Sequence, residues 1–179
     1  MLQLFQVTKK GETIMKSTMN RELFERLEQA ESEQQLTELQ QEVTQGGYSS
    51  FYQLQEHFHE RVRHFTQDEA QHVLALIDKA RQLFPVPAKF SPSWQSIWTE
   101  LEQTTRLKLK VFETIPAGER DGEWQIVMDN PIAIQQTACY PGLTFMEAAY
   151  MFGYFRPQLE KNEYIRLQKI QQLIMEFGT

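Results

Sequence analysis

The fold class depends on residues 106–129, which read RLKLKVFETIPAGERDGEWQIVMD. Residues 107–111, LKLKV, alternate apolar side chains with lysines, and residues 124–129, WQIVMD, continue the alternation. A period of two is typical of a half-buried β-strand. Gly118 and Gly122 lie between the two runs and are typical of a connecting loop. We therefore expect an antiparallel β-hairpin over about residues 106–129.

A strand at the start of this hairpin would place three basic side chains on one side of the sheet. Arg106, Lys108 and Lys110 are in phase with a period of two. Acids on the facing strand, such as Glu123, are suitable partners for them. We expect this basic strip to be solvated or paired with such acids.

The chain before the hairpin predicts helices. Asn20 is a suitable N-cap for a first helix, and Gly46 with Gly47 is typical of its end. A second helix starts at Ser49 or Ser50 and carries an apolar stripe at helical spacing. The members of this stripe are Phe51, Leu54, Phe58, Val62 and Phe65.

Two further start signals follow in this helical part, which covers residues 20–105. Thr66 and Glu69 have the spacing of a capping box, so a third helix begins there. Ser91 followed by Pro92 combines a capping residue with a proline at the first helical position, which predicts a fourth helix.

The chain after the hairpin predicts two more helices. Thr144 and Glu147 again have capping-box spacing, and Arg156 with Pro157 begins a long last helix. Residues 132–138 are compatible with a third strand or with a short helix. An isolated hairpin is marginally stable, so it must pack on helices or recruit another strand. The expected fold is α+β and predominantly α, with a helical half, a hairpin and two C-terminal helices.

The length of 179 residues suits one domain, which we expect to cover residues 15–179, with the hairpin and last helices in residues 106–179. Residues 1–14 have two interpretations. Codons for Lys10, Gly11 and Glu12 can contain a bacterial ribosome-binding sequence at the usual distance before Met15. Residues 1–14 are accordingly either a translated leader or a short edge strand.

Composition and charge exclude several classes of protein. A net charge of −6 without a basic half argues against binding to nucleic acid or to a membrane surface. The single cysteine, Cys139, cannot form an internal disulfide, and its apolar neighbours predict a small buried residue. With no spanning segment and no signal-peptide pattern, we expect a cytoplasmic protein.

The sequence carries no motif of a nucleotide-binding loop, a nucleophile elbow or a zinc protease. No catalytic residue is therefore assigned and no cofactor is expected. This absence favours a non-enzymatic protein.

All four histidines lie within residues 57–72, interleaved with acids. His57, Glu60 and His64 share one helical face, and Glu69 with His72 forms a single ExxH pair. Dimetal sites in helical bundles use two such pairs with further glutamates, so polar surface histidines are the simpler interpretation. Metal binding through these five side chains is one alternative hypothesis.

Residues 145–164 resemble the general spacing of a helix-turn-helix. Ala149, Gly153 and Leu159 stand where this motif needs a small residue, a turn glycine and an apolar anchor. Asn162 stands where a second anchor is expected, and two acids in the second helix would repel phosphates. DNA binding through this segment is a second alternative.

The same segment also predicts a packing helix with an aromatic outer surface. Small residues on one helical face allow another helix to approach closely, while tyrosine, phenylalanine and arginine are enriched at binding hot spots. The candidate partner-binding residues are Tyr150, Tyr154, Phe155 and Arg156. Our main hypothesis is a non-enzymatic bacterial protein that acts through protein–protein interaction or regulation, with another protein or a second copy as its partner.

Overall fold

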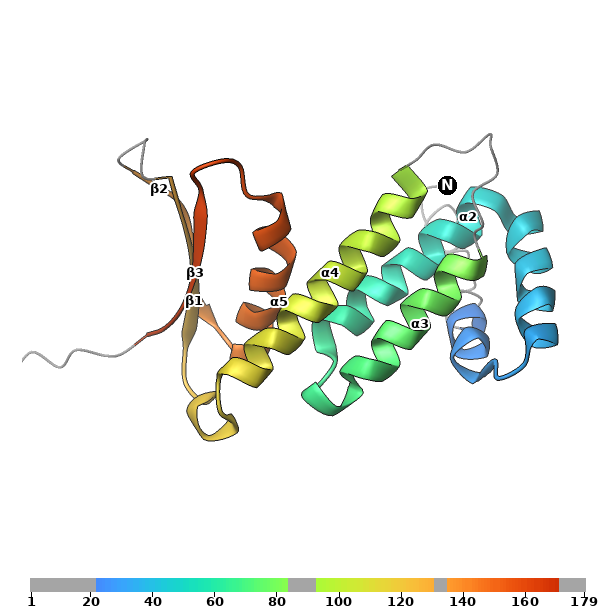
Figure 1. The fold of residues 1–179 in the computed structure, drawn as a ribbon, viewed down its shortest axis with the longest axis horizontal. Coiled ribbons are helices and arrows are strands. Elements are labelled where there is room, and N and C mark those ends of the chain that lie inside the picture. The colour runs from blue at the N-terminus through green and yellow to red at the C-terminus, as the bar shows by residue number, and fades with distance from the viewer. Residues whose placement is uncertain (1–21, 84–92, 131–134, 171–179) are drawn as a thin grey trace, which may run out of the picture. The chain divides into compact units, whose positions relative to one another are not determined.

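The computed structural model describes residues 22–83, 93–130 and 135–170, and it confirms a predominantly helical α+β fold (Figure 1). Residues 1–14, Asn20, Ser91 and Pro92 lie outside these ranges. None of the described helices is long and apolar enough to cross a bilayer. Residues 22–29 are helical, and the elements that follow are α2 (Glu33–His64), α3 (Ala70–Leu83), α4 (Ser93–Thr114), β1 (Trp124–Asn130), β2 (Gln135–Leu143), α5 (Phe145–Phe155) and β3 (Tyr164–Lys169).

The chain divides into two compact units. The first, which we call the helical unit, holds described residues 22–61, 71–83 and 93–99. The second, the mixed unit, holds residues 62–70, 100–130 and 135–170. The expectation of a single domain stays a prediction.

The core of the helical unit is built around Trp98. Its indole lies edge-on to Phe51 and Phe58, with ring centroids 5.8 and 5.3 Å apart. Such edge-to-face pairs add to the stabilisation that burial alone provides. The predicted apolar stripe is confirmed, because Phe51, Leu54, Phe58, Val62 and Phe65 are all buried. Its first three members lie in this unit, whereas Val62 and Phe65 belong to the mixed unit, Phe65 being the residue directly after the end of α2.

The helix end predicted at Gly46 and Gly47 is wrong, because α2 runs through both residues. The break in the helical path lies earlier, at residues 30–32. Ser32 begins α2 with a capping box: the Gln35 backbone N–H donates to Ser32 Oγ at 3.2 Å, and the Ser32 N–H donates to Gln35 Oε1 at 3.1 Å. Glycine has a low helix propensity, but two features outweigh it here. The capping box at Ser32 fixes the start of α2, and α2 residues are buried on both sides of the glycine pair.

The predicted capping box before α3 is confirmed. The Thr66 backbone N–H donates to the Glu69 carboxylate at 2.8 Å, and its hydroxyl donates to the same oxygen at 3.0 Å. A short 3-10 turn, Gln67–Glu69, leads from this cap into α3.

The first half of the predicted hairpin is wrong, because residues 106–112 belong to α4. The reason is that Lys108 is buried, so the leucine–lysine alternation does not separate core from solvent. The buried side chains recur at a spacing of three to four residues, which is the period of a helix. They are Leu101, Thr104, Thr105, Lys108, Val111 and Phe112.

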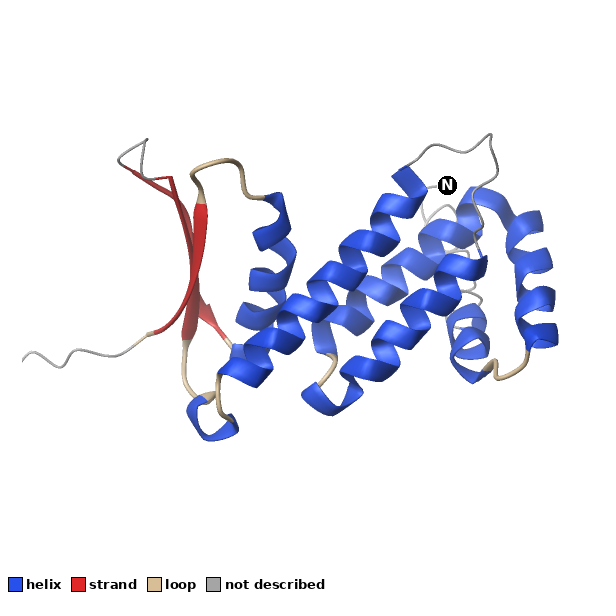
Figure 2. Cartoon of the chain, in the orientation of Figure 1, coloured by secondary structure: helices blue, strands red, loops and turns tan. Residues whose placement is uncertain are grey.

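The hairpin of the mixed unit is formed by β1 and β2, which pair antiparallel with Val127 opposite Cys139. The strand interpretation of residues 132–138 is therefore correct from Gln135 onward. β3 pairs antiparallel with the other side of β1, which gives the order β2-β1-β3. Figure 2 shows the strands in red and the helices in blue. The hairpin that forms is not the predicted one, but it meets both conditions expected for a stable hairpin, because it gains β3 and packs on α5.

The long last helix predicted after Arg156 is wrong. A 3-10 turn, Arg156–Gln158, follows α5, and the chain then turns at Asn162, which has a positive φ of 76°. Residues 164–169 are a strand in register with β1, where Ile165 faces Met128 and Leu167 faces Ile126. The cross-strand pairing of these apolar residues outweighs the helical spacing of the local sequence.

α5 covers one face of the sheet, and no described helix covers the other (Figure 1). Phe145 packs on Trp124, with ring centroids 5.2 Å apart. The uncovered face is polar: Gln125 Nε2 donates to Gln168 Oε1 at 2.9 Å, and Arg166 pairs with Asp129. The sheet is thus solvated on one side and packed on the other, as is common for antiparallel sheets.

Candidate partner-binding surface

The start of α5 is fixed by the capping box that the sequence predicts. The Thr144 backbone N–H donates to Glu147 Oε2 at 2.9 Å, and the Glu147 N–H donates to Thr144 Oγ1 at 3.3 Å. These hydrogen bonds from Thr144 hold the pKa of the Glu147 carboxyl below its usual range. The carboxylate therefore stays ionised at neutral pH and stabilises the helix N-terminus.

The buried face of α5 consists of Phe145, Ala148, Ala149 and Gly153, as the packing interpretation predicts. A Cβ atom on Gly153 would lie 2.6 Å from the Thr104 carbonyl oxygen and 3.3 Å from the Lys108 backbone nitrogen. Gly153 thus lets α5 approach the backbone of α4 directly. The two helices of the mixed unit could not lie this close with any larger residue at position 153.

The helix-turn-helix interpretation of residues 145–164 is wrong. Gly153 lies inside α5 and not at a turn between helices. Where the motif needs a second helix, the chain forms a 3-10 turn and then strand β3. The segment therefore offers no recognition helix to a DNA groove.

Three of the four predicted partner-binding residues form a continuous ring cluster with Tyr140. Tyr150 and Tyr154 stack at 6.1 Å, Tyr154 meets Phe155 edge-on at 5.3 Å, and Phe155 stacks on Tyr140 at 5.6 Å. We call these four residues the aromatic row. Tyr140 is exposed and the other three are half-buried, so the row is accessible from solvent. Tyr140 could not be predicted as a member of the row because only the fold brings β2 beside Phe155.

A cation lies at one end of the aromatic row. The Arg63 guanidinium carbon is 5.4 Å from the centroid of the Tyr150 ring, which is within cation–π range. Burial raises the pKa of the Tyr150 phenol, and the charge of Arg63 opposes this rise. Tyr150 therefore stays a neutral phenol at physiological pH and can both donate and accept a hydrogen bond.

Arg156, the fourth predicted residue, borders a separate groove of about 390 Å³. Residues from α4, α5, β3 and the 3-10 turn line this groove, all within the mixed unit. The strand expected at residues 107–111 would place Lys110 on the opposite side from Leu107 and Val111, whereas the helix brings all three to one side. The other lining residues come from α5, the 3-10 turn and β3, whose positions beside α4 could not be predicted. The lining residues are Leu107, Lys110, Val111, Thr114, Ile115, Phe152, Arg156 and Leu167.

The basic strip expected on the first strand does not exist, because its three members lie on a helix. Lys108 is fully buried and its Nζ donates to three backbone carbonyls at 2.6–3.1 Å. Lys110 is exposed at the groove, and Arg106 pairs with Glu102 of the same helix at 2.9 Å.

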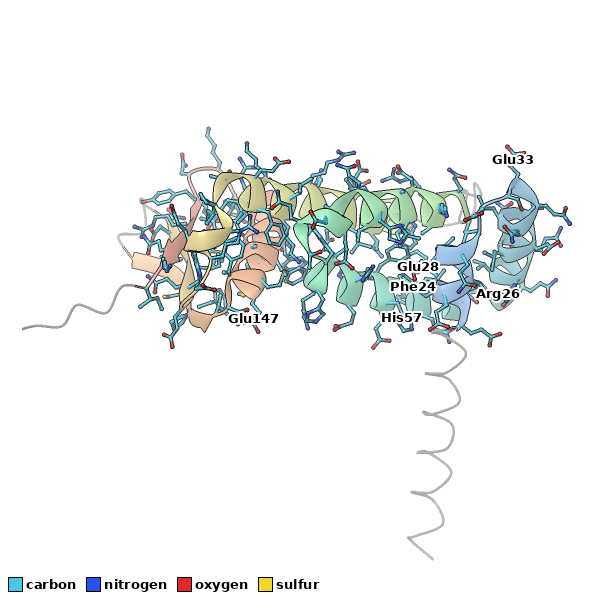
Figure 3. All side chains as sticks on the ribbon, turned by 90° about the horizontal axis from the view of Figure 1, so that it is seen from below. Phe24, Arg26, Glu28, Glu33, His57 and Glu147 are labelled. Atoms are coloured by element: carbon cyan, nitrogen blue, oxygen red, sulfur yellow. The ribbon has the colours of Figure 1, made fainter. Side chains whose placement is uncertain are left out.

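The histidines and acids singled out as metal candidates do not converge. Across residues 22–83, 93–130 and 135–170, no three histidine, cysteine or acidic side chains are placed to hold a metal ion. His57 packs its ring on Phe24, with centroids 5.7 Å apart (Figure 3). His72 Nε2 lies 3.0 Å from Glu28 Oε1. The candidates His57, Glu60, His64, Glu69 and His72 are therefore not a metal cluster.

Cys139 is exposed, so the expectation of a buried thiol is wrong. It lies opposite Val127 in the edge strand β2, with its Sγ 3.9 Å from Gln125 Oε1 on the polar face of the sheet. The prediction from its apolar sequence neighbours failed because Cys139 lies on the face of the sheet that α5 does not cover.

The chain matches no known protein family, no curated protein and no solved structure. Similarity therefore contributes nothing to a functional assignment. The function has to be inferred from the surfaces of the mixed unit.

Proposed function

We propose that this chain is a non-enzymatic bacterial protein of the cytoplasm that acts through protein–protein interaction, with the aromatic row as its contact surface. The observation that carries the proposal is the chain of ring contacts from Tyr150 through Tyr154 and Phe155 to Tyr140. Aromatic residues are enriched at protein interfaces and dominate their binding energy. The expected partner is another protein or a second copy of the chain.

The row is held in a defined conformation before any partner binds. Each of its rings contacts at least one other, so fewer side-chain rotamers are open to them in the free protein. The cap at Thr144 and the contact of Gly153 with α4 fix the helix that carries three of the rings. Binding to a preorganised surface costs less conformational entropy than binding to a flexible one.

The phenol groups add specificity to this apolar surface. Tyrosines combine a large apolar ring with a hydroxyl that seeks a hydrogen-bond partner when it is buried. A partner that covers Tyr150 and Tyr154 must therefore supply polar groups opposite their hydroxyls, or it leaves them unsatisfied at a cost.

A pull-down with the tagged full chain from lysate of the source organism tests the proposal. We expect a protein partner that survives nuclease treatment, is lost with Tyr150→Ala plus Tyr154→Ala, and is retained with Tyr52→Ala. Tyr52 is the matched control, because it is 60% exposed and belongs to the other unit. Equal recovery with the double variant and with the wild type would contradict the proposal, provided circular dichroism shows the same helix content in both.

A further inference from the structure

The groove of the mixed unit has an apolar floor made by three elements. Leu107, Val111 and Ile115 follow one another at intervals of four residues and so share one side of α4 and of the turn after it. Phe152 from α5 and Leu167 from β3 complete the floor. Its volume of about 390 Å³ falls in the range of ligand-binding clefts, which is roughly 300–1,000 Å³.

Two cations border this floor. Lys110 is exposed on α4, and Arg156 is exposed at the end of α5. Within the described ranges, neither charged group makes an ion pair or a side-chain hydrogen bond. Lys110 and Arg156 are thus free to meet an anion from outside the chain.

Most other cations of this unit within the described ranges have partners, and the exposed Lys161 is an exception that does not line the groove. Arg106 pairs with Glu102, Arg166 pairs with Asp129, and Lys169 donates to the Glu119 carbonyl at 2.9 Å. The chain has 24 acidic against 18 basic residues, so acids are in excess. The two free cations at the groove therefore do not result from a shortage of carboxylates in this chain.

We propose that the groove binds a protein segment in which carboxylate side chains flank apolar ones, and this proposal rests on the proposed function in protein–protein interaction. The apolar side chains of the segment would cover the floor, and its carboxylates would meet Lys110 and Arg156. An arginine can bind a carboxylate through two parallel hydrogen bonds, which adds directional specificity. An apolar floor with a few placed polar groups is the usual composition of a recognition site.

A protein segment fits this site better than a small molecule because the groove shares α5 with the aromatic row. Phe152 and Arg156 belong to the groove, and Tyr154 and Phe155 from the same stretch belong to the row. Phe152 and Tyr154 point to different sides of α5, so a partner that contacts both surfaces must pass around the end of this helix, which a protein segment can do and a small molecule cannot.

Peptide display tests the proposal directly. A library of random dodecapeptides is selected on the immobilised full-length protein, and the affinity of each enriched peptide is measured by fluorescence polarisation. We expect enriched peptides to combine Asp or Glu with Leu, Ile or Phe. Lys110→Glu and Arg156→Glu should each weaken their binding about tenfold, the effect of losing one well-placed charge contact.

Lys161→Glu is the matched control. It makes the same change of charge on an exposed lysine of the same unit that does not line the groove. Its affinity for the enriched peptides should equal that of the wild type. The doubly charge-reversed protein, Lys110→Glu plus Arg156→Glu, should instead select peptides rich in Lys and Arg.

Three outcomes would overturn the proposal. No peptide is enriched, the enriched peptides lack acids, or Lys110→Glu and Arg156→Glu bind the enriched peptides as tightly as Lys161→Glu does. The pull-down with Tyr150→Ala plus Tyr154→Ala tests the aromatic row independently of the groove. A partner lost with the tyrosine variant, together with any of these three outcomes, would leave the row as the interface without the groove. If the tyrosine variant keeps its partner and the selected acidic peptides lose affinity with Lys110→Glu, the groove is a binding site and the aromatic row is not.

Discussion

The burial of Lys108 explains why residues 107–111, in which apolar side chains and lysine alternate, form a helix. Its ammonium group has an acceptor for each of its three hydrogens, namely the carbonyls of Val62, Arg63 and Phe65, at 3.0, 2.6 and 3.1 Å. It also lies 4.0 Å from the centroid of the Phe65 ring. The lysine thereby binds the free carbonyls at the end of α2, as cations near helix C-termini do.

The stability of the protein should depend on pH through Lys108. Burial lowers the pKa of its ammonium from 10.5 to about 7, and the charge of Glu69 opposes this fall. Between these two pH values the unfolded chain binds more protons at this site than the folded chain does. The free energy of unfolding should therefore gain a contribution that rises from about pH 7 to about pH 10.5.

Urea unfolding of the wild type and of Lys108→Met at several pH values across this window measures the contribution. We expect the difference in unfolding free energy between the two proteins to shift in favour of the wild type as pH rises. Parallel curves would mean that the lysine keeps an ordinary pKa in the folded protein. Arg106→Met, at an exposed position of the same helix, should give a curve parallel to that of the wild type.

The burial of Lys108 among three backbone carbonyls could not be predicted from residue types alone. Its three acceptors come from the end of α2, more than forty positions away in the chain. Sequence analysis treats a lysine as solvated because buried lysines are rare. The exposure of Cys139 was missed for a related reason, since it follows from which face of the sheet α5 covers.

At the scale of elements, the close approach of α5 to α4 holds the mixed unit together. Gly153→Ala should destabilise the protein by about 1–3 kcal/mol, the usual cost of forcing an extra carbon into a packed contact. The obstacle is the Thr104 carbonyl oxygen, which would lie 2.6 Å from the added Cβ atom and, as a backbone atom, cannot rotate away.

Gly118→Ala is the control for this substitution. A Cβ at position 118 would meet no heavy atom within 4 Å, so the change should stay within about 0.5 kcal/mol of the wild type. Chemical denaturation followed by circular dichroism measures both variants. Equal stability of the two would show that the α4–α5 contact can relax at little cost.

The two capping boxes predicted starts correctly, while the starts predicted at Ser49 or Ser50, at residue 106 and at Arg156 are wrong. The capping boxes at Thr66 and Thr144 lie within four residues, and both are confirmed. β3 was taken for a helix because its pairing with β1 depends on residues about forty positions earlier. The aromatic face of α5 could be predicted, while Tyr140 and the groove needed the fold.

At the scale of the whole molecule, the two candidate binding surfaces belong to the mixed unit. The aromatic row and the groove are both built on α5, which joins them in one region of the chain. This arrangement suits a partner that places apolar groups on the rings and an acidic segment along the groove. The helical unit contributes no residue to either surface.

Site-specific photocrosslinking in living cells tests the central claim, that the aromatic row contacts a partner protein. Tyr154 is replaced by the photoreactive p-benzoylphenylalanine, and Tyr52 by the same residue as the control. We expect light to convert the chain with the probe at position 154 into a discrete covalent adduct with one protein, and no such adduct with the probe at position 52. No adduct at position 154, or the same adducts at both positions, would contradict the account.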